Sequence, residues 1–382
     1  MDVTRIALLG STGSIGRQTL EVVASQPEQL AVVALAAGRN VALLGEQVAR
    51  FRPRLVAVAG PERPALTGVD VLTGAEGLIA AATLPEADIV VVATSGHAAI
   101  LPTLRAIEAG KTIALANKES IVCAGEIILP AARRRGVAIR PVDSEHSAIW
   151  QCIGSAPGDE VSRVTLTASG GPFRDTPLAE LAGVTIEQAL AHPNWTMGSK
   201  VTIDSATMMN KGLEVIEAHW LFDLPYAKIG VVIQPQSIVH SLVSFQDGAV
   251  LAQLAVPDMR IPIQYALSYP ARWPASAPRL EIDRLNRLDF QPPSAERYPA
   301  LRLARQAGEA GSTYPTVLSG ADEVAVAAFL AGRIRFTAIA AIVAEVLDRH
   351  RPAPAPLTLQ AIAAADDWAQ RTAADLVAAR AG

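Results

Sequence analysis

Residues 6–16 read Ile6-Ala7-Leu8-Leu9-Gly10-Ser11-Thr12-Gly13-Ser14-Ile15-Gly16, an apolar run followed by glycines spaced three residues apart. The apolar run predicts a buried strand, and the helical pattern from Ile15 to Ala24 predicts a helix directly after the loop. Glycines in such a loop let backbone amides approach a pyrophosphate at the helix N-terminus. A tight turn without a ligand is the competing interpretation. The strand before the loop and the helix after it favour a dinucleotide-binding site.

Strand and helix patterns continue to alternate from this loop to about residue 143. The alternation is typical of a parallel, doubly wound α/β sheet. The predicted strands are Ile6–Leu9, Ala31–Leu35, Leu55–Val58, Ile89–Ala93, Thr112–Ala116 and Ala138–Val142. The predicted helices are Ile15–Ala24, Val41–Phe51, Ile100–Ala109 and Gly125–Arg135. We therefore expect an N-terminal Rossmann-like domain over residues 1–143.

Beyond residue 150 the pattern changes twice. Strands follow one another at Arg163–Ala168, Val231–Ile233, Ile238–Phe245 and Val250–Val256, and Asp247-Gly248 predicts a hairpin between the last two. These features predict a central α+β domain with an antiparallel sheet over residues 144–268. A proline-rich linker over 269–297 and a C-terminal α-helical bundle over 298–382 follow. The predicted bundle helices are Ala300–Ala310, Asp322–Leu330, Ala338–Arg349 and Leu359–Arg380.

Composition narrows the class of protein. The chain has 382 residues, of which 50% are hydrophobic and 18% are charged, so we expect a globular protein of two or three domains. A net charge of -4 argues against general affinity for nucleic acid. Cys123 and Cys152 are too few for a disulfide framework or a thiolate zinc site. Without a basic, apolar leader or a run long enough to cross a bilayer, we expect a cytoplasmic protein with no membrane partner.

Two segments after predicted strands bear on the cofactor. Arg39 follows the second strand, where a fold that prefers NAD usually offers an acid to the ribose, so NADP is favoured. Arg39 as a solvated residue at a helix start is the alternative. Lys118, in Asn117-Lys118-Glu119, follows the fifth predicted strand and could contact ribose or an anionic substrate. Ordinary helix-start residues are an equally open interpretation there.

A pair of acids, Asp143 and Glu145, follows the sixth predicted strand with Ser144 between them. The carboxyl end of a strand in an open α/β sheet normally faces the ligand crevice. Two carboxylates taken out of water require a shared proton, basic partners or a divalent cation. Glu214 offers a third oxygen ligand and favours the cation. Because no H-E-x-x-H motif or cysteine set is present, magnesium or manganese is favoured, with cobalt possible.

Two further segments carry polar side chains suited to a substrate. Asn210 and Lys211 lie within one helical turn of Glu214 and could hold a phosphate. The segment around His192 and Trp195 is flanked by glycine and proline, which suits a lid over a ligand, although both residues could equally be structural. Ser205 could also contact phosphate.

Six ordered motifs together resemble the 1-deoxy-D-xylulose 5-phosphate reductoisomerase family over nearly the whole length. The motifs are Leu9-Gly10-Ser11-Thr12-Gly13-Ser14-Ile15-Gly16, Ala116-Asn117-Lys118-Glu119, Pro141-Val142-Asp143-Ser144-Glu145-His146, Ala168-Ser169-Gly170-Gly171-Pro172-Phe173, His192-Pro193-Asn194-Trp195-Thr196-Met197-Gly198, and residues 204–214. The resemblance implies an NADPH- and metal-dependent enzyme that isomerises and reduces a sugar phosphate in isoprenoid precursor biosynthesis. It also implies a homodimer, with the sheet of the central, catalytic domain as a plausible interface.

The resemblance also implies roles for individual residues. The metal ligands are Asp143, Glu145 and Glu214, and the phosphate ligands are Ser169, Ser205, Asn210 and Lys211. His192 closes over the substrate from a mobile loop in which Trp195 and Met197 form the cover. Lys118, Ser144, Glu145 and Glu214 also contact substrate. The NADPH site is lined by Thr12, Gly13, Ser14, Ile15, Gly38, Arg39, Asn40, Asn117, Glu119 and Gly198, and Ser237 and Met259 lie near the nicotinamide.

The sequence leaves two alternative functions open, and it departs from the family pattern at one place. Another NADP-dependent oxidoreductase, such as a semialdehyde or sugar-phosphate dehydrogenase, is the alternative enzyme, but neither cysteine lies in a convincing nucleophile motif. A nucleotide-sensing regulator is the alternative without catalysis, and it leaves the three acids unexplained. The departure is Ser319-Gly320-Ala321-Asp322-Glu323, where the family usually has Asn-Ala-Ala-Asn-Glu. We expect it to affect local packing.

Overall fold

The computed structural model describes residues 3–60, 63–154, 156, 158–195 and 197–380, so Thr196 of the lid motif lies outside the described residues. The chain folds into two compact units. Unit 1 comprises residues 1–120, 128–150 and 258–279, and unit 2 comprises 121–127, 151–257 and 280–382. The three predicted domains and the linker stay a prediction, because compactness divides the chain differently.

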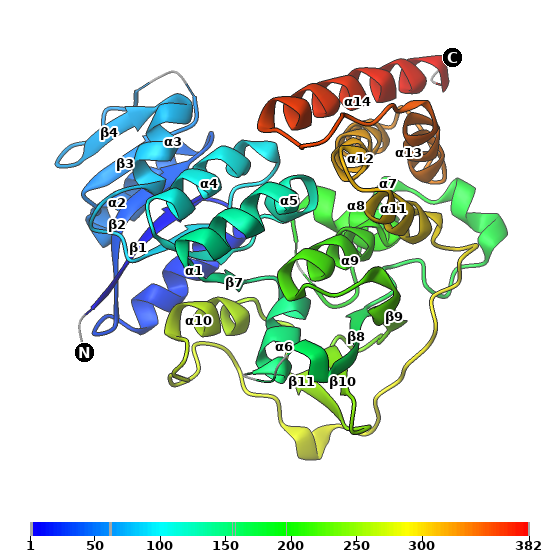
Figure 1. The fold of residues 1–382 in the computed structure, drawn as a ribbon, viewed down its shortest axis with the longest axis horizontal. Coiled ribbons are helices and arrows are strands. Elements are labelled where there is room, and N and C mark those ends of the chain that lie inside the picture. The colour runs from blue at the N-terminus through cyan, green and yellow to red at the C-terminus, as the bar shows by residue number, and fades with distance from the viewer. Residues whose placement is uncertain (1–2, 61–62, 155, 157, 196, 381–382) are drawn as a thin grey trace. The chain divides into compact units, whose positions relative to one another are not determined.

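Unit 1 is built on a parallel sheet of seven strands in the order β4-β3-β2-β1-β5-β6-β7. Figure 1 labels β1 to β4 and β7 of this sheet. Its chain order reverses at β1, whose neighbours are β2 and β5, as a doubly wound sheet requires. The strands are β1 (Thr4–Leu9), β2 (Leu30–Ala37), β3 (Leu55–Val58), β4 (Asp70–Thr73), β5 (Ile89–Val92), β6 (Thr112–Leu115) and β7 (Ile139–Pro141). The six predicted strands are confirmed, and β4 was not predicted.

The helices of unit 1 and the two helices that run into unit 2 follow the predicted alternation. They are α1 (Ser14–Ser25), α2 (Val41–Phe51), α3 (Gly74–Ala82), α4 (Ile100–Glu108), α5 (Lys118–Arg135), α6 (Ser144–Ile153) and α10 (Arg260–Ser268), with a 3-10 turn η1 at His97–Ala99. α5 begins at Lys118 and is kinked at Ala124, whose φ of -127° and ψ of 16° are not helical. The predicted helix from Gly125 to Arg135 is the part after this kink, and the part that starts at Lys118 was not predicted. The helix starts there because Asn117 caps it: its Oδ1 accepts a hydrogen bond from the Ser120 backbone N–H at 2.8 Å.

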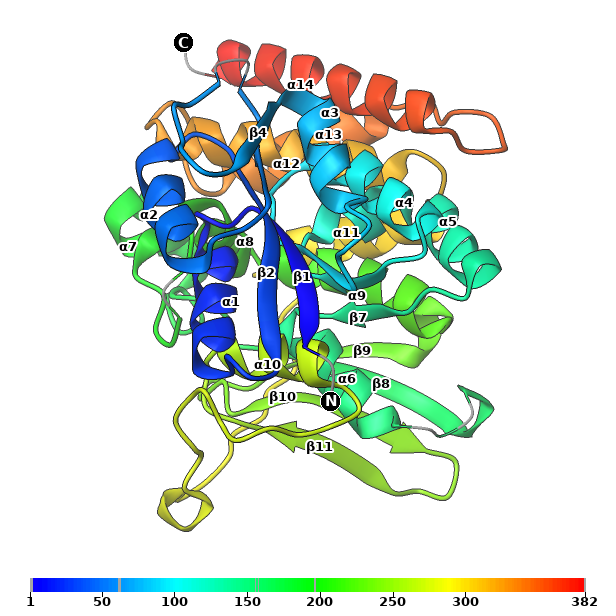
Figure 2. The ribbon, with the colours of Figure 1, turned by 90° about the vertical axis from the view of Figure 1, so that its left-hand side faces the viewer.

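One long-range return of the chain completes the core of unit 1. α10 lies against α1, as Figures 1 and 2 both show. Ile263, Ala266 and Leu267 of α10 are buried in the same hydrophobic cluster as Ile6 and Leu8 of β1. Met259, predicted to lie near the nicotinamide, packs against this cluster. Residues near 260 therefore help to support the strand that leads into the glycine loop.

Unit 2 contains a sheet of four strands in the order β11-β10-β8-β9. The strands are β8 (Val161–Ala168), β9 (Ile229–Ile233), β10 (Val239–Phe245) and β11 (Val250–Leu254). The hairpin at Asp247-Gly248 is confirmed, because β10 and β11 are antiparallel neighbours and Gly248 has a φ of 89°. The prediction of an antiparallel sheet is wrong for one pair: β8 and β9 are parallel, because a long stretch of helices and loops separates them and lets the chain cross over.

Helices make up the rest of unit 2. They are α7 (Ile186–Leu190), α8 (Ser199–Thr207), α9 (Met209–Phe222), α11 (Pro299–Ala310), α12 (Tyr314–Leu330), α13 (Ala338–Arg349) and α14 (Leu359–Arg380), with 3-10 turns η2 (Gly158–Glu160), η3 (Leu178–Gly183), η4 (Tyr226–Lys228) and η5 (Ile282–Arg284). The predicted C-terminal helices are confirmed, except that α12 begins at Tyr314 and not at Asp322. Figure 1 shows α12, α13 and α14 packed together. No helix within the described residues has both the length and the apolarity to span a bilayer.

Candidate active site

The glycine loop between β1 and α1 has the geometry that a dinucleotide needs. Gly10 has a φ of 89°, and a Cβ there would lie 2.5 Å from the carbonyl oxygen of Ala93. A Cβ on Gly16 would collide with the carbonyl oxygen of Gly10. Only glycine fits these two positions, so the loop stays close to the sheet. The first N–H groups of α1 then remain for an anion, because Gly13 at the N-cap offers no side chain.

The loop after β2 lies next to the glycine loop in the sheet. Ser11 and Gly10 both donate backbone hydrogen bonds to the carbonyl oxygen of Ala36 at 2.8 Å, which ties the ends of β1 and β2 together. Arg39 is exposed at this end, while Asn40 caps α2 through its Oδ1 and the N–H of Leu43 at 3.1 Å. Gly38 is also exposed, and a Cβ at that position would meet open space. An exposed guanidinium beside a pyrophosphate site fits a ribose 2′-phosphate.

Asn117 is buried at the end of β6 and its side chain is fully engaged. Its Nδ2 donates to the carbonyl oxygens of Thr94 at 2.9 Å and Gly96 at 3.1 Å, and to Oε2 of Glu119 at 2.6 Å. These bonds join the loop after β5 to the start of α5. Asn117 and Glu119 therefore shape the edge of the sheet where the predicted cofactor residues lie.

Asp143 meets Lys118 because adjacent parallel strands, β6 and β7, end beside each other. The Lys118 ammonium is ion-paired with Asp143 Oδ2, and Nδ1 of the buried His146 is 3.5 Å from the same oxygen. Burial by itself raises the pKa of Asp143, but the Lys118 ammonium and His146 hold that pKa well below its usual range. Asp143 is thus a carboxylate at neutral pH, as a metal ligand must be.

Ser144 and Glu145 form the first turn of α6, directly after Asp143. The Ser144 hydroxyl donates to Oε2 of Glu145 at 2.5 Å. Carboxylates at this position interact favourably with the N-terminus of a helix. In unit 1 the structure therefore brings together four predicted residues, Lys118, Asp143, Ser144 and Glu145, at one end of the sheet.

His192 in unit 2 links two predicted phosphate ligands. Its Nε2 is 3.0 Å from Oγ of Ser169 and 3.1 Å from Oγ of Ser205. Its Nδ1 accepts hydrogen bonds from the backbone N–H groups of Asn194 at 3.1 Å and Trp195 at 3.0 Å. Nδ1 therefore carries no proton, Nε2 carries one, and burial lowers the pKa of His192. A neutral imidazole thus presents an N–H to the two serine hydroxyls.

The close approach of two chain segments explains why these serines meet. Gly171, with a φ of 68°, passes so near α8 that a Cβ there would lie 2.8 Å from the carbonyl oxygen of Ser205. The N–H of Gly171 also donates to Oγ of Ser169 at 3.1 Å. The Gly170-Gly171 pair therefore lets the loop after β8 reach the helix that carries Ser205.

The segment after His192 is anchored at Asn194. Its Nδ2 donates to the carbonyl oxygen of Pro235 and to Oγ of Ser237, both at 2.7 Å. Trp195 is partly buried, with its ring centroid 6.2 Å from that of His240, and Met197 is partly buried as well. Gly198 is exposed and caps α8. The hypothesis that this segment is a lid stays a prediction.

Glu214 is completely buried in α9 and is held by the two neighbours that the sequence singled out. Asn210 Nδ2 is 2.6 Å from Oε1, and Lys211 Nζ is 2.5 Å from Oε2. Met208, with a φ of 63°, forms the sharp junction between α8 and α9, which turns Asn210 and Lys211 into the first turn of the new helix. Each unit thus contains a carboxylate compensated by a lysine.

One charged cluster in unit 2 was missed by the sequence analysis. Lys200 in α8 is ion-paired with Asp204, one turn further along, and with Asp322 in α12. The i, i+4 spacing of Lys200 and Asp204 could have indicated the first pair. No local signal connects either residue with Asp322, which is 122 residues from Lys200.

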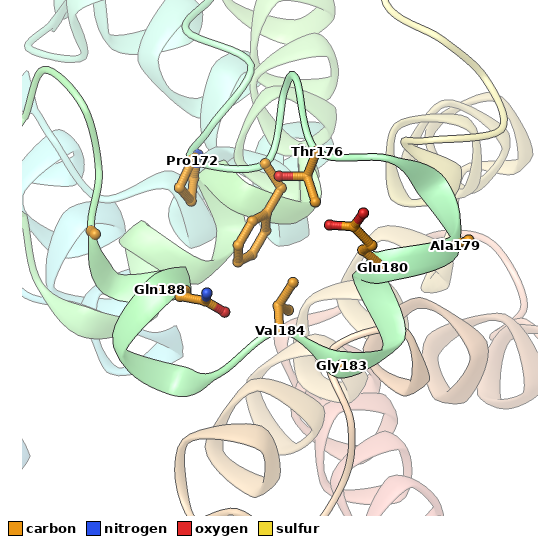
Figure 3. Close-up of a pocket in the computed structure, with 9 residues that line it drawn as sticks. Pro172, Thr176, Ala179, Glu180, Gly183, Val184 and Gln188 are labelled. Atoms are coloured by element: carbon orange, nitrogen blue, oxygen red, sulfur yellow. The ribbon is translucent and has the colours of Figure 1, made fainter.

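A separate pocket lies in unit 2 between the loop after β8 and the short helices η3 and α7 (Figure 3). It has a volume of about 670 Å³. Its lining is mixed, with Pro172, Phe173 and Val184 beside the polar Thr176, Glu180 and Gln188. Within the described part of the chain, none of the predicted cofactor, metal or substrate residues lines it.

Comparison with known proteins matches most of the chain to a single enzyme family. Residues 6–125 match the 1-deoxy-D-xylulose 5-phosphate reductoisomerase family, residues 139–222 match the C-terminal domain of that enzyme, and residues 254–372 match the DXP reductoisomerase C-terminal domain. The 1-deoxy-D-xylulose 5-phosphate reductoisomerase of Thermomicrobium roseum is 60% identical over 376 residues, which are 97% of each chain. That of Moorella thermoacetica is 55% identical over 375 residues, 96% of this chain and 97% of the relative.

Solved structures agree with this result. A 1-deoxy-D-xylulose 5-phosphate reductoisomerase from Zymomonas mobilis in complex with NADPH superposes with a TM-score of 0.91 at 43% identity, covering 98% of this chain and 99% of that one. A DOX-P reductoisomerase in complex with NADPH, fosmidomycin and magnesium gives a TM-score of 0.94 at 38% identity, with 98% of both chains covered. The six sequence motifs, the fold and the relatives all lead to one conclusion: the chain belongs to the 1-deoxy-D-xylulose 5-phosphate reductoisomerase family.

Proposed function

We propose that the chain converts 1-deoxy-D-xylulose 5-phosphate to 2-C-methyl-D-erythritol 4-phosphate, using NADPH and a divalent cation, in isoprenoid precursor biosynthesis. The observation that carries the proposal is 60% identity to a relative of that name over 97% of both chains. The solved relatives that contain NADPH, fosmidomycin and magnesium support the cofactors and a small phosphate-like ligand. This function replaces the two alternatives, a different dehydrogenase and a nucleotide-sensing regulator.

Unit 1 supplies all the predicted cofactor-lining residues in this proposal except Gly198, which belongs to unit 2. The glycine loop fits NADPH because the backbone packs closely on itself at Gly10 and Gly16, where a Cβ would collide. The loop therefore keeps its backbone N–H groups in place for the pyrophosphate. The predicted lining is Thr12, Gly13, Ser14, Ile15, Gly38, Arg39, Asn40, Asn117, Glu119 and Gly198. Arg39 would bind the 2′-phosphate, since it is exposed next to the glycine loop.

The donor set for the cation consists of Asp143, Glu145 and Glu214. Magnesium and manganese prefer hard oxygen ligands, which these carboxylates provide, and the lowered pKa of Asp143 keeps one of them ionised. Lysines compensate Asp143 and Glu214 in their own units. Arrival of a cation would therefore release Lys118 and Lys211 from the carboxylates and make both ammonium groups available to the substrate.

The substrate phosphate is assigned to Ser169, Ser205, Asn210 and Lys211. His192 donates its Nε2 proton to the serine hydroxyls, so each hydroxyl can in turn direct its own proton to a phosphate oxygen. Ser144 and Lys118 lie beside Asp143 and Glu145 and would contact the hydroxyl and carbonyl groups of the substrate. Binding the phosphate far from the reacting carbons supplies energy for orienting them.

When bound, the cation polarises the ketone and NADPH supplies a hydride to the rearranged aldehyde. The protein contributes orientation through the phosphate ligands, charge through Lys118 and Lys211, and a cover of Trp195 and Met197 that excludes water. We assign no described side chain of the site the role of general base.

A cofactor assay tests this function directly. NADPH oxidation is followed with 1-deoxy-D-xylulose 5-phosphate, with and without magnesium, and the product is identified by NMR. We expect oxidation only when substrate and metal are both present. Folded protein that shows no metal-dependent NADPH consumption would contradict the proposal. Glyceraldehyde 3-phosphate serves as the control substrate for a general sugar-phosphate dehydrogenase.

A homodimer located in the cytoplasm remains a further prediction. β11 is the edge strand of the unit 2 sheet, and its Val250 and Leu251 are 53% and 49% exposed. An exposed apolar edge strand is suited to pairing with a second copy. Light scattering should give twice the chain mass, and Leu251→Lys should shift it towards that of a monomer.

A further inference from the structure

Lys200 is placed between two buried carboxylates from different helices of unit 2. Its Nζ is 2.6 Å from Oδ2 of Asp204 in α8 and 2.6 Å from Oδ2 of Asp322 in α12. Asp204 is 3% exposed and Asp322 is 0% exposed. The proposed reaction uses none of these three residues, which we call the Lys200 clamp.

The charges of the clamp do not balance if both acids are ionised. One ammonium and two carboxylates leave a net negative charge in a buried position, which is costly. The outer oxygens, Oδ1 of Asp204 and Oδ1 of Asp322, are buried and accept no hydrogen bond from the described residues. A single proton held by the pair removes the excess charge and turns one acid into a donor. Burial and the neighbouring Asp322 accordingly raise the pKa of Asp204 well above its usual range, against the opposing effect of Lys200.

Across the described residues of the surrounding elements, no other charged group compensates this pair. α8 packs against α7, α9, α11 and α12, and α12 also packs against α11, α13 and α14. The other charged or titratable groups on these helices are exposed, are bonded to other partners, or are acids that add no positive charge. The exposed groups are Glu187, Arg302, Glu309, Glu323, Asp348, Asp367, Arg371 and Asp375. The groups bonded to other partners are Lys211, paired with Glu214; His219, bonded to the carbonyl of Leu224; Arg305, bonded to the carbonyls of Tyr226 and Ile229; Glu345, paired with Arg349 and Arg380; and Asp366, which accepts from Gln370. Glu217 is a buried acid on α9.

The clamp is directly connected to a predicted phosphate ligand. Ser205 follows Asp204 in α8, and its Oγ contacts His192 Nε2 at 3.1 Å. Asp204 and Lys200 fix this face of α8 to α12, while Gly171 packs on the same helix at Ser205. A change in the Lys200 clamp therefore moves the Ser205 hydroxyl or changes the charge near it. This hydroxyl is a predicted ligand of the substrate phosphate.

We propose that Lys200, Asp204 and Asp322 are positioning residues for the substrate phosphate, and that they hold Ser205 in place only while the carboxyl pair retains one proton. Loss of that proton leaves a buried negative charge beside the phosphate site, which loosens the link between α8 and α12 and repels the phosphate dianion. The inference rests on the proposed function, because it takes Ser205 as a phosphate ligand.

The variant Asp322→Asn tests the role of the proton. An asparagine has the shape of a protonated aspartate and donates a hydrogen bond, but it cannot ionise. KM and kcat for 1-deoxy-D-xylulose 5-phosphate are measured for both proteins from about pH 5 to about pH 9. We expect equal KM values at the acid end. At the alkaline end the KM of the unmodified protein should exceed that of the variant about threefold to tenfold, with kcat in a constant ratio.

Glu323→Gln is the matched control, because it removes the exposed acid one position further along α12. Its KM should follow that of the unmodified protein at every pH. His192 and the substrate phosphate titrate in the unmodified protein, in Asp322→Asn and in Glu323→Gln. Their effect therefore cancels in the ratio of the KM values of two proteins at the same pH. Asp322→Ala removes the clamp without replacing it and should raise KM at every pH.

Unfolding experiments give a readout that does not depend on catalysis. A carboxyl whose pKa is raised by folding binds more protons in the folded state, so its contribution to stability is present at acid pH and is lost as pH rises through the folded pKa. Burial and the charge of Asp322 raise the pKa of Asp204, so removing that charge in Asp322→Asn should reduce the loss of stability towards alkaline pH, and Glu323→Gln should not differ from the unmodified protein.

Parallel KM and stability profiles for Asp322→Asn and the unmodified protein would overturn the inference. So would a variant that resembles Asp322→Ala at every pH, because the ionised pair would then be the working form. Failure of the proposed function is distinguishable: the unmodified protein would then show no metal-dependent turnover, whereas the stability profiles would still report the proton.

Discussion

The glycine loop of unit 1 and the His192 segment of unit 2 present hydrogen-bond donors in different ways. The glycine loop uses backbone N–H groups, and its shape depends on the absence of side chains at Gly10 and Gly16. The His192 segment uses side chains, with one imidazole joining Ser169 to Ser205. Backbone donors suit a cofactor whose pyrophosphate is always the same. Side-chain donors can be charged, neutralised or moved, which suits a substrate that must enter and leave.

The carboxylates extend this comparison. Asp143 in unit 1 is ion-paired with Lys118 and Glu214 in unit 2 with Lys211, whereas Asp204 and Asp322 share Lys200. We expect Lys118 and Lys211 to be exchanged for a metal ion. The Asp204–Asp322 pair is one positive charge short and suited to hold a proton.

Glu214→Gln should have the largest effect and separates the two units most clearly. The substitution removes a metal ligand but keeps the size of the side chain, so kcat should fall about 10³-fold or more. Because the predicted cofactor residues, apart from Gly198 and Ser237, belong to unit 1 and none of them is Glu214, the Kd for NADPH should change less than about twofold. Fluorescence titration with NADPH and steady-state kinetics give both values.

Glu309→Gln, an exposed acid on α11, is the control for Glu214→Gln and should retain full activity. A Glu214→Gln protein that has lost NADPH affinity would show that this residue supports folding and does not act as a ligand.

Gly16→Ala should damage the backbone site. Its Cβ would collide with the carbonyl oxygen of Gly10, so the loop must move and stability should fall by about 1–3 kcal/mol. NADPH affinity should fall more than about tenfold. Gly45→Ala in α2 is the matched control, since the nearest atom to its Cβ is Leu66 Cδ2 at 3.5 Å. Unchanged NADPH binding by Gly16→Ala would refute the role of this loop.

Arg39→Ala should have a smaller and more selective effect. Loss of the guanidinium removes a charge-assisted contact to the 2′-phosphate, so the Kd for NADPH should rise about tenfold while that for NADH stays the same. Arg50→Ala, an exposed arginine on α2, should leave both values unchanged. Equal losses for both cofactors would show that Arg39 acts on the fold and does not read the phosphate.

Titration of His192 should have the smallest effect of the changes considered, and the quantity affected is the stability of the folded protein. Burial lowers its pKa, so the neutral form contributes stability that is present above pH 6.5 and is lost as pH falls through the folded pKa. Protonation at Nδ1 would also remove the acceptor for the N–H groups of Asn194 and Trp195. NMR titration, with His192→Gln for assignment, should place this pKa below 6.5, and a value above 6.5 would contradict the neutral tautomer described above.

The strands and helices that were predicted from the sequence are those with a regular pattern of apolar residues. The six strands around the glycine loop were recognised because each is a short apolar run between helical segments. β4 and α3 were missed because Asp70–Thr73 is half-polar and the residues after it are mostly glycine or alanine. α12 begins at Tyr314, well before the predicted start at Asp322, because Pro315 is compatible with a first turn and Gly320 packs closely against Asp366 of α14.

Contacts between distant segments explain what the sequence could not predict. Ser169, His192 and Ser205 were assigned through the family motifs, and only the fold shows that one imidazole joins them. The departure at Asp322 was expected to affect packing alone. The structure shows that its carboxylate binds Lys200, a residue without any local pattern that points to α12.

The central proposal is that Asp143, Glu145 and Glu214 hold one divalent cation. The most direct measurement is a crystal structure with manganese and 1-deoxy-D-xylulose 5-phosphate, in which anomalous scattering locates the ion. The account predicts one anomalous peak bonded to carboxylate oxygens of Asp143, Glu145 and Glu214. A peak bonded to the acids of only one unit, or placed away from all three, would contradict it.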